Sequence, residues 1–241
     1  KTIRLTEAGN LLLQEILPIL DSCKAVESKI KQLDRRAPIR IVSSITIASY
    51  YLPDALHRFE ASHPDIPVYV NVVSAANAIE VLQAENADIA LVEGLPPHGP
   101  YQSTPFSSYP LLTLCSPDYP HSRQPLSPSA LSEERLLLRE KGSAIRDVLD
   151  SALYLYGFTA HPLWTSVNSP ALIEAAKAGL GITILPDILV KDALNEGSLI
   201  SLETEGLSLI NQLLLVTHKD KYLTEPLAEL IRIMVPDETL H

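Results

Sequence analysis

The N-terminal part of the chain carries apolar residues at alternating spacings of four and three residues, which is the heptad pattern of a coiled coil. The residues of this heptad seam are Leu12, Ile16, Ile19, Cys23, Val26, Ile30 and Leu33. A stripe this narrow buries against another helix and is too small to face a broad core. The sequence therefore predicts a long N-terminal helix whose seam residues form a dimerisation contact between copies of the chain.

Polar and proline residues mark the ends of this predicted helix. Thr6 is a suitable N-cap, because its hydroxyl accepts a hydrogen bond from the first turn, and Glu7 favours the positive end of the helix dipole. We expect the helix to run to about Arg36, and Pro38 ends it. Pro18 lacks an N–H donor and predicts either one kinked helix or two shorter helices.

Beyond the helix, strand-like and helix-like patterns alternate through two units of similar size. The expected strands are residues 39–43, 67–73, 88–92, 111–115, 136–139, 164–167, 182–185, 199–202 and 212–217, and the expected helices are residues 48–62, 77–84, 143–156, 169–178, 187–194 and 223–235. This order predicts an α/β fold with parallel strands and right-handed crossovers. Proline-rich residues 94–110 are expected to form an irregular connection. The late strand at 212–217 would return to the first unit, so that two hinge strands join two lobes across a cleft.

Small polar residues occur at four predicted strand-to-helix corners, where open α/β sheets bind ligands. The corners are Ser43-Ser44-Ile45-Thr46, Ser74-Ala75-Ala76-Asn77, Gly142-Ser143-Ala144 and Asn168-Ser169. If the lobes face each other, these corners line one cleft with hydroxyls and backbone donors, which suits a small carboxylate or a similar anion. The alternative is that these residues only cap helices. Arg139 and Arg146 lie near the third corner, and Arg146 is interpreted as solvated or ion-paired rather than as a ligand contact.

The charge and the cysteine content limit the partners of the chain. The net charge is −10, which argues against nucleic-acid binding through a basic face of these lobes. Residues 1–36 contain seven Lys and Arg against five Asp and Glu, so contact with a polyanion would belong to the N-terminal side. Cys23 and Cys115 provide no disulfide framework and fit a reducing cytoplasm. The sequence has no run of about 18 apolar residues, so no membrane partner is expected.

Sequence motifs for catalysis and for metal binding are missing. The seven histidines show no HExxH or paired metal spacing, and there is no GxSxG elbow. Gly179-Leu-Gly181 begins like a dinucleotide fingerprint, but it lies between a helix and a strand, where phosphate loops do not occur. Cys115 falls in an apolar strand and is expected to be an inert buried thiol. The sequence therefore predicts no enzyme, no metal site and no cofactor.

A series of short motifs runs in order along nearly the whole chain. The motifs are Arg4-Leu-Thr-Glu-Ala-Gly9 before the long helix, Ile39-Arg-Ile-Val-Ser-Ser, Tyr51-Leu-Pro53, Phe59 with His63-Pro64, Asp88-Ile-Ala-Leu, Gly142-Ser-Ala-Ile-Arg146 and Ala178-Gly-Leu-Gly-Ile-Thr-Ile-Leu-Pro186. This series resembles the LysR-type transcriptional regulators. The resemblance implies a linker helix followed by two Rossmann-like lobes of the periplasmic-binding-protein type, with a DNA-binding winged helix-turn-helix domain preceding them.

The resemblance also implies how the chain is divided and where an effector binds. Residues 1–37 would form the end of the winged helix-turn-helix and the linker helix, residues 38–114 with 217–241 the first lobe, and residues 115–216 the second lobe. The implied effector-contacting residues are Ser43, Ser44, Thr46, Ala75, Gly142, Ser143, Ala144 and Asn168. Many family members have a hydroxyl where this chain has Ala75 and Ala144. A smaller or more apolar ligand, or no ligand, therefore remains an alternative to an anion.

We therefore predict a cytoplasmic, ligand-responsive transcriptional regulator whose partners are a small-molecule effector, promoter DNA and further copies of itself. A ligand in the cleft would stabilise one arrangement of the lobes through unequal affinity for the two arrangements. One alternative is a solute-binding protein of a transport system, which shares the two lobes but should lack the seam-forming helix and be monomeric. The other is a small-molecule enzyme on the same scaffold, against which stands the missing catalytic constellation.

Overall fold

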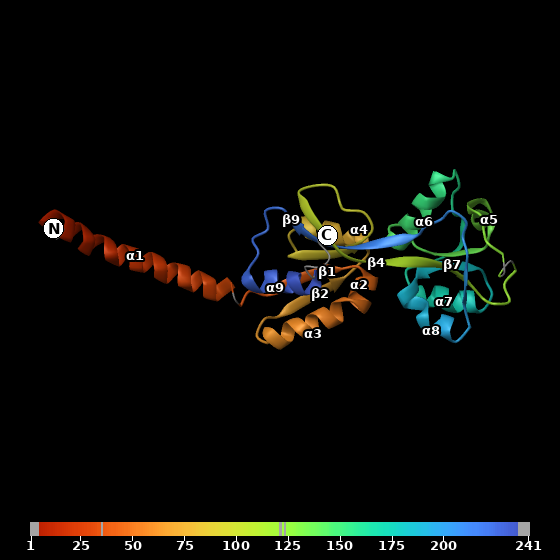
Figure 1. The fold of residues 1–241 in the computed structure, drawn as a ribbon, viewed down its shortest axis with the longest axis horizontal. Helices are drawn as coiled ribbons and strands as arrows, with labels where there is room; N and C mark the ends of the chain where they lie inside the picture. The colour runs from red at the N-terminus through yellow and green to blue at the C-terminus, as the bar shows by residue number, and fades with distance from the viewer. Residues whose placement is uncertain (1–4, 35, 121, 123, 236–241) are drawn as a thin grey trace, which may run out of the picture.

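The computed structural model describes residues 5–34, 36–120, 122 and 124–235. A long helix, α1 (Glu7–Asp34), projects from a body of two α/β lobes that lie end to end along the longest axis of the molecule (Figure 1). The predicted α/β class and the alternation of strands and helices are confirmed. Residues 1–4, 35 and 236–241 of the predicted domains lie outside the described part of the chain.

Helix α1 is continuous, so the alternative of two shorter helices is wrong. Thr6 caps the helix as predicted, because its Oγ1 accepts a hydrogen bond from the N–H of Gly9 at 3.2 Å. The helix passes through Pro18, whose missing N–H removes one hydrogen bond of the ladder. The seam residues are solvent-exposed, up to 72% at Leu33. The apolar stripe is therefore available for contact with another helix.

The first lobe is built on the strand order β2-β1-β3-β9-β4. Its strands are β1 (Ile39–Ser43), β2 (Val68–Val72), β3 (Ile89–Glu93), β9 (Ile210–His218) and the first part of β4 (Tyr101–Cys115). As predicted, β1 pairs in parallel with both β2 and β3. Strand β9 then pairs antiparallel with β3 and with β4.

Helices cover both faces of the first sheet. They are α2 (Ile45–Tyr50), α3 (Leu52–Ser62), α4 (Ala75–Gln83) and α9 (Glu225–Met234). Ile41 of β1 belongs to the apolar cluster that contains Phe59 of α3 and Leu230 of α9. The next residue, Val42, belongs to a second cluster with Ala78 of α4. Successive side chains of a strand point to opposite faces, so β1 is buried on both sides.

The second lobe repeats the parallel arrangement. Its strands are β5 (Leu136–Arg139), β6 (Pro162–Ser166), β7 (Ile182–Pro186) and β8 (Ile200–Leu202), and its helices are α5 (Pro128–Glu133), α6 (Ala144–Leu155), α7 (Ser169–Lys177) and α8 (Asp187–Asn195). Strand β5 is parallel to β6 and β7, whereas β7 and β8 are antiparallel to β4. Parallel strands present their carboxyl ends, and the polar corners that follow them, at one edge of the sheet.

Strand β4 passes from one sheet into the other. Residues Tyr101–Pro110 pair with β9, and Leu111–Leu114 pair with β7. Where the chain returns, the N–H of Leu111 donates a hydrogen bond to the carbonyl of Leu209 at 2.8 Å. This pairing favours crossings near residues 110 and 210. The lobe boundaries predicted at 114/115 and 216/217 stay a prediction.

Two local expectations are wrong. The stretch 94–110, expected to be irregular, contains the first part of β4. Prolines fit there because β4 pairs only with β9 over these described residues, and a bulge follows Pro105. The helix expected at 48–62 is divided at Tyr51 into α2 and α3, because Pro53 has no N–H with which to continue the first helix. The short helix α5 was not predicted.

Gly181, which lies between α7 and β7, offers a test of their close approach to the backbone directly before β5. A methyl group at Gly181 would overlap the carbonyl oxygen of Arg135, which accepts the N–H of Ile182. We expect Gly181→Ala to lower the free energy of unfolding by about 3 kcal/mol through overpacking. Gly197, with a φ of +70°, has open space around it, so Gly197→Ala should cost only about 1 kcal/mol. Urea unfolding of both variants measures the difference, and equal losses would contradict the close approach.

Candidate functional site

The predicted corners of the two lobes meet around a narrow gap between them. The predicted residues that line this gap are Ser44, Thr46, Ala75, Ser143 and Ala144. Ser43 and Gly142 adjoin this lining without being part of it, and Asn168 lines a separate cavity of about 350 Å³ together with Thr46. The volume of the gap is about 10 Å³, which holds about one water molecule. The lobes therefore lie close together at these corners.

Hydrogen bonds at the helix starts test the capping alternative. Ser74 caps α4 by accepting a hydrogen bond from the N–H of Asn77 at 3.3 Å. Within the described residues, the side chains of Ser44, Ser143 and Asn168 make no such bond at the starts of α2, α6 and α7. The buried Oγ of Ser44 forms no hydrogen bond of standard geometry in the same part of the chain, but it lies close enough to Glu93 to help lower the pKa of that carboxyl. Capping therefore explains one corner and leaves three with other roles.

Small residues allow the close approach of the lobes. A methyl group at Gly94 would lie 3.7 Å from the Cβ of Ala144, and one at Gly142 would lie 4.0 Å from the Cβ of Ala76. Both glycines have positive φ angles, +100° and +84°, which residues with a Cβ rarely adopt. Gly142 therefore shapes the backbone of the third corner, and this role needs no contact between Gly142 and a ligand.

Glu93 is a buried acid of the gap that the sequence analysis missed. It ends β3, and only 8% of it is exposed. Burial raises the pKa of the Glu93 carboxyl, while hydrogen bonding from Thr46 lowers it in part. Its Oε1 has no hydrogen-bond partner among the residues that the structure describes. The available signal was an acidic residue at the end of an apolar strand, on the sheet edge where the corners were expected.

A tyrosine and an asparagine on the two hinge strands form the floor beneath Glu93. Tyr109 of β4 and Asn211 of β9 are paired in the sheet, and Asn211 Nδ2 donates a hydrogen bond to Tyr109 Oη at 3.1 Å. Burial, and then the charge of Glu93, raise the pKa of Tyr109. Asn211 Oδ1 is buried without a partner in the described chain. The strands that join the lobes thus place polar side chains behind Glu93, outside the lining of the gap.

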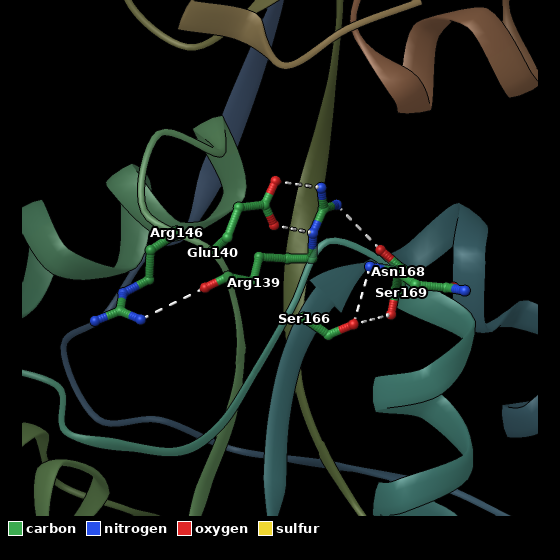
Figure 2. A network of polar contacts seen from close by, with 6 residues as sticks. All are labelled: Arg139, Glu140, Arg146, Ser166, Asn168 and Ser169. Atoms are coloured by element: carbon green, nitrogen blue, oxygen red, sulfur yellow. Dashed lines mark hydrogen bonds and ion pairs between the residues drawn. The ribbon is translucent and has the colours of Figure 1, made fainter.

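Two buried arginines of the second lobe are already paired (Figure 2). Arg139 donates to both carboxylate oxygens of Glu140, at 2.8 and 3.0 Å, and to the hydroxyl of Ser169 at 3.1 Å. Arg146 donates to Asp150 at 2.8 Å and reaches the carbonyls of Arg139 and Ala160. The interpretation of Arg146 as ion-paired is confirmed. Both guanidiniums therefore already share their charge with a neighbouring carboxylate of the second lobe.

A larger cavity of about 500 Å³ lies beside the gap, between α4 of the first lobe and α6 of the second. Ala75, Glu93 and Ala144 line both spaces, so the cavity adjoins the gap. Its walls are mainly apolar, with Asp147 as a second acid. Burial, and then the charge of Asp150, raise the pKa of Asp147. The volume falls within the range of about 300 to 1,000 Å³ that small-molecule sites occupy.

Metal chemistry finds no support in the described residues, since no group of three His, Cys, Asp or Glu side chains among them is placed to hold an ion. Cys115 is buried in β4, and burial followed by the charge of Glu134 raises the pKa of its thiol to about 11. The thiol therefore stays protonated at neutral pH, as expected for an inert side chain. None of the helices in the described ranges is long and apolar enough to cross a membrane.

A family model described as the LysR substrate binding domain matches residues 34–237. The chain belongs to the LysR family. The fold, the family and the predicted function as a LysR-type transcriptional regulator are confirmed.

Relatives of the LysR family match over most of their length. The uncharacterized HTH-type transcriptional regulator YeiE of Escherichia coli K12 is 28% identical over 232 residues, which are 94% of this chain and 77% of the relative. CbbR of Rhodospirillum rubrum is 26% identical over 230 residues, which are 95% of this chain and 76% of the relative. The regulatory domain of CcmR from Synechocystis PCC6803, solved in complex with 2-PG, matches with a TM-score of 0.73 and 20% identity over 82% of this chain and 96% of that one. These relatives are regulators, which disfavours the solute-binding alternative.

The buried position of Glu93 predicts a pH-dependent cost to stability. The folded chain holds the Glu93 proton more tightly than the unfolded chain, so the free energy of unfolding falls as the pH rises above the ordinary pKa of 4.5. Glu93→Gln removes this cost. We expect Glu93→Gln to raise Tm by about 3 °C or more at pH 8 and to change it little at pH 4.5.

Thermal unfolding at the two pH values measures this difference. The control is Glu196→Gln, because Glu196 is exposed at the end of α8 and should give the same small change at both pH values. A lower Tm for Glu93→Gln than for the unmodified chain at pH 8 would contradict the argument from burial.

Proposed function

We propose that the gap between the lobes is the effector site of this LysR-family regulator. The proposal depends on Ser44 and Ser143, which come from different lobes and line the gap without capping a helix through their side chains. They lie around Glu93, whose Oε1 has no hydrogen bond of standard geometry in the described structure. A buried polar atom without a hydrogen bond costs about 1–3 kcal/mol. A ligand that supplies the missing partner recovers this free energy, which favours binding.

The predicted effector-binding residues take different parts in this proposal. Thr46, Ala75 and Ala144 complete the lining with Ser44 and Ser143. Ser43 Oγ donates to the carbonyl of Ser44 at 3.0 Å, so we assign Ser43 a supporting role in the backbone of the first corner. Asn168 belongs to the neighbouring cavity and would contact a ligand that extends past Thr46. The complex of the CcmR domain with 2-PG supports small-molecule binding by this fold.

Ligand binding is proposed to act on the arrangement of the lobes. The site takes residues from both lobes, and its floor consists of Tyr109 and Asn211 on the strands that join them. A ligand changes the balance between two arrangements only by the difference in its affinity for them. Contacts that exist only when the corners meet provide that difference. The role is binding without turnover, in keeping with a family of regulators.

Oligomerisation and DNA binding complete the proposed function. The exposed heptad seam of α1 would join copies of the chain into dimers or tetramers, because apolar stripes of this spacing pair with another helix. Promoter DNA is the proposed macromolecular partner, since the curated relatives are named HTH-type transcriptional regulators. A cytoplasmic location belongs to the same proposal.

Serine substitutions test the effector site. A thermal-shift screen of metabolites should yield ligands that raise Tm, and Ser44→Ala or Ser143→Ala should weaken each of them about tenfold through the loss of one hydrogen bond. Ser208→Ala is the control, because Ser208 is exposed and lies outside the gap. Titration calorimetry of the hits measures the affinities. Hits that bind both variants as tightly as the unmodified chain would place the effector elsewhere.

Cys23 offers a test of the seam. It is the middle residue of the seam and is exposed, whereas Cys115 is buried. Mild oxidation should give a covalent dimer on a non-reducing gel, because helices that pair through the seam bring the Cys23 thiols together. Cys23→Ser should remove the dimer, and the matched control Cys115→Ser should keep it. A chain that sediments as a monomer in ultracentrifugation and fails to cross-link would rule out the predicted helix pair.

A further inference from the structure

The cavity between α4 and α6 carries information on the class of ligand. The inference depends on the proposed effector site and narrows the ligand of that site. The walls of the cavity are mainly small or branched apolar side chains, such as Ile79, Val92 and Val148. Among the described lining residues the ionisable ones are the acids Glu93 and Asp147, and there is no Lys, Arg or His. The cavity is therefore apolar with a local excess of negative charge.

Nearby cations offset these acids only in part, because each cation is shared with another carboxylate. Arg139, whose charge acts on Glu93, is held by both oxygens of Glu140, and Arg146, whose charge acts on Asp147, is held by Asp150. A buried anion needs a paired cation or several donors to offset the loss of hydration. An anionic ligand would instead meet two carboxyl groups and no free cation among the residues described around the cavity.

The unpartnered atoms at the inner end of the cavity are acceptors. Glu93 Oε1 is buried and has no partner within the described chain, and Asn211 Oδ1, about 4.0 Å from the position of a methyl group at Gly94, has none there either. Gly94 itself lines the cavity. Only Glu93 lines the cavity, and its ionised carboxylate accepts hydrogen bonds, so a donor on the ligand would supply the partner that Oε1 lacks.

We propose that the cavity between α4 and α6 binds an apolar molecule bearing an amine or a hydroxyl group, which donates its hydrogen bond to Oε1 of Glu93. The apolar part of the ligand covers Ile79 and Val148, and the donor lies at the boundary with the gap. The absence of hydroxyls at Ala75 and Ala144, which line both spaces, fits a ligand of this class better than the small carboxylate expected from the corners alone. The raised pKa of Glu93 adds to this preference, because pairing with an amine restores the charged form of the carboxyl.

Three probes of one shape test the proposal. Cyclohexylamine, cyclohexanol and cyclohexanecarboxylate are titrated into the full chain at pH 7.5, with affinities measured by calorimetry. We expect the amine and the alcohol to bind at least tenfold more tightly than the carboxylate. Glu93→Gln keeps the size of the side chain and removes its charge, so the amine should weaken about tenfold and the alcohol by less than threefold. Glu80→Gln is the matched control, because Glu80 is exposed on α4 and does not line the cavity.

A cavity-filling variant separates this proposal from the proposed function. Ala152 lines the cavity and is only half-buried, so Ala152→Phe should block the space while the chain still folds, as thermal unfolding will show. Val148→Phe serves the same purpose from the neighbouring turn of α6. Loss of amine and alcohol binding in these variants supports the proposal. Binding of the amine and the alcohol that persists in both filled variants overturns it.

The remaining outcomes distinguish failure of the proposed ligand class from failure of the proposed effector site. Tighter binding of the carboxylate than of the amine, or no binding of any probe, overturns the ligand class. If metabolite hits nevertheless depend on Ser44 and Ser143, the effector site itself stands. If the affinity of the hits is unchanged by Ser44→Ala, by Ser143→Ala and by Ala152→Phe, both the effector site and the ligand class are overturned.

Discussion

The arrangement of the two lobes depends on the antiparallel pairing of β4 with β9. Residues 101–110 pair with residues 210–218 in the first sheet, and β4 then continues into the second sheet. The same strands place Tyr109 and Asn211 beneath the gap. The strands that connect the two lobes are therefore the same strands that carry these two polar side chains. In the proposed mechanism, a change in hydrogen bonding at Tyr109 or Asn211 would act on the strands that join the lobes, because both residues belong to those strands.

The buried charges divide into satisfied and unsatisfied groups. The arginines of the second lobe have strong, local partners, Glu140 and Asp150, at one and four residues along the chain. Glu93 has no such partner at its Oε1 within the described residues, although it is as deeply buried. A fully paired buried charge mainly specifies structure, whereas an unpaired polar atom in a cavity indicates a place for a ligand. This difference supports the proposed assignment of Glu93 to the binding surface and of the two arginines to its scaffold.

Much of the fold could be predicted from the sequence because its signals are local. Apolar periodicity placed nearly all strands and helices, and the polar corners followed from their order. The prolines of residues 94–110 misled the prediction, because edge pairing with β9 is a long-range property that local composition does not contain. Glu93, Tyr109 and Asn211 were missed for the same reason, since the topology alone brings residues so far apart in sequence together. The size and the charge of the larger cavity also depend on how the lobes meet.

The spacing of the heptad seam does not determine whether two paired α1 helices would be parallel or antiparallel. Steps of three and four residues alternate on both sides of Cys23, so the apolar contacts suit helices that run the same way and helices that run oppositely. Pro18 breaks this symmetry, because it lies five residues before the midpoint. Parallel helices in register would place the two prolines at the same level, whereas antiparallel helices centred on Cys23 would place each proline near residue 28 of the other helix. In the proposed assembly, the two orientations would therefore place the missing amide hydrogen of Pro18 against different parts of the partner helix.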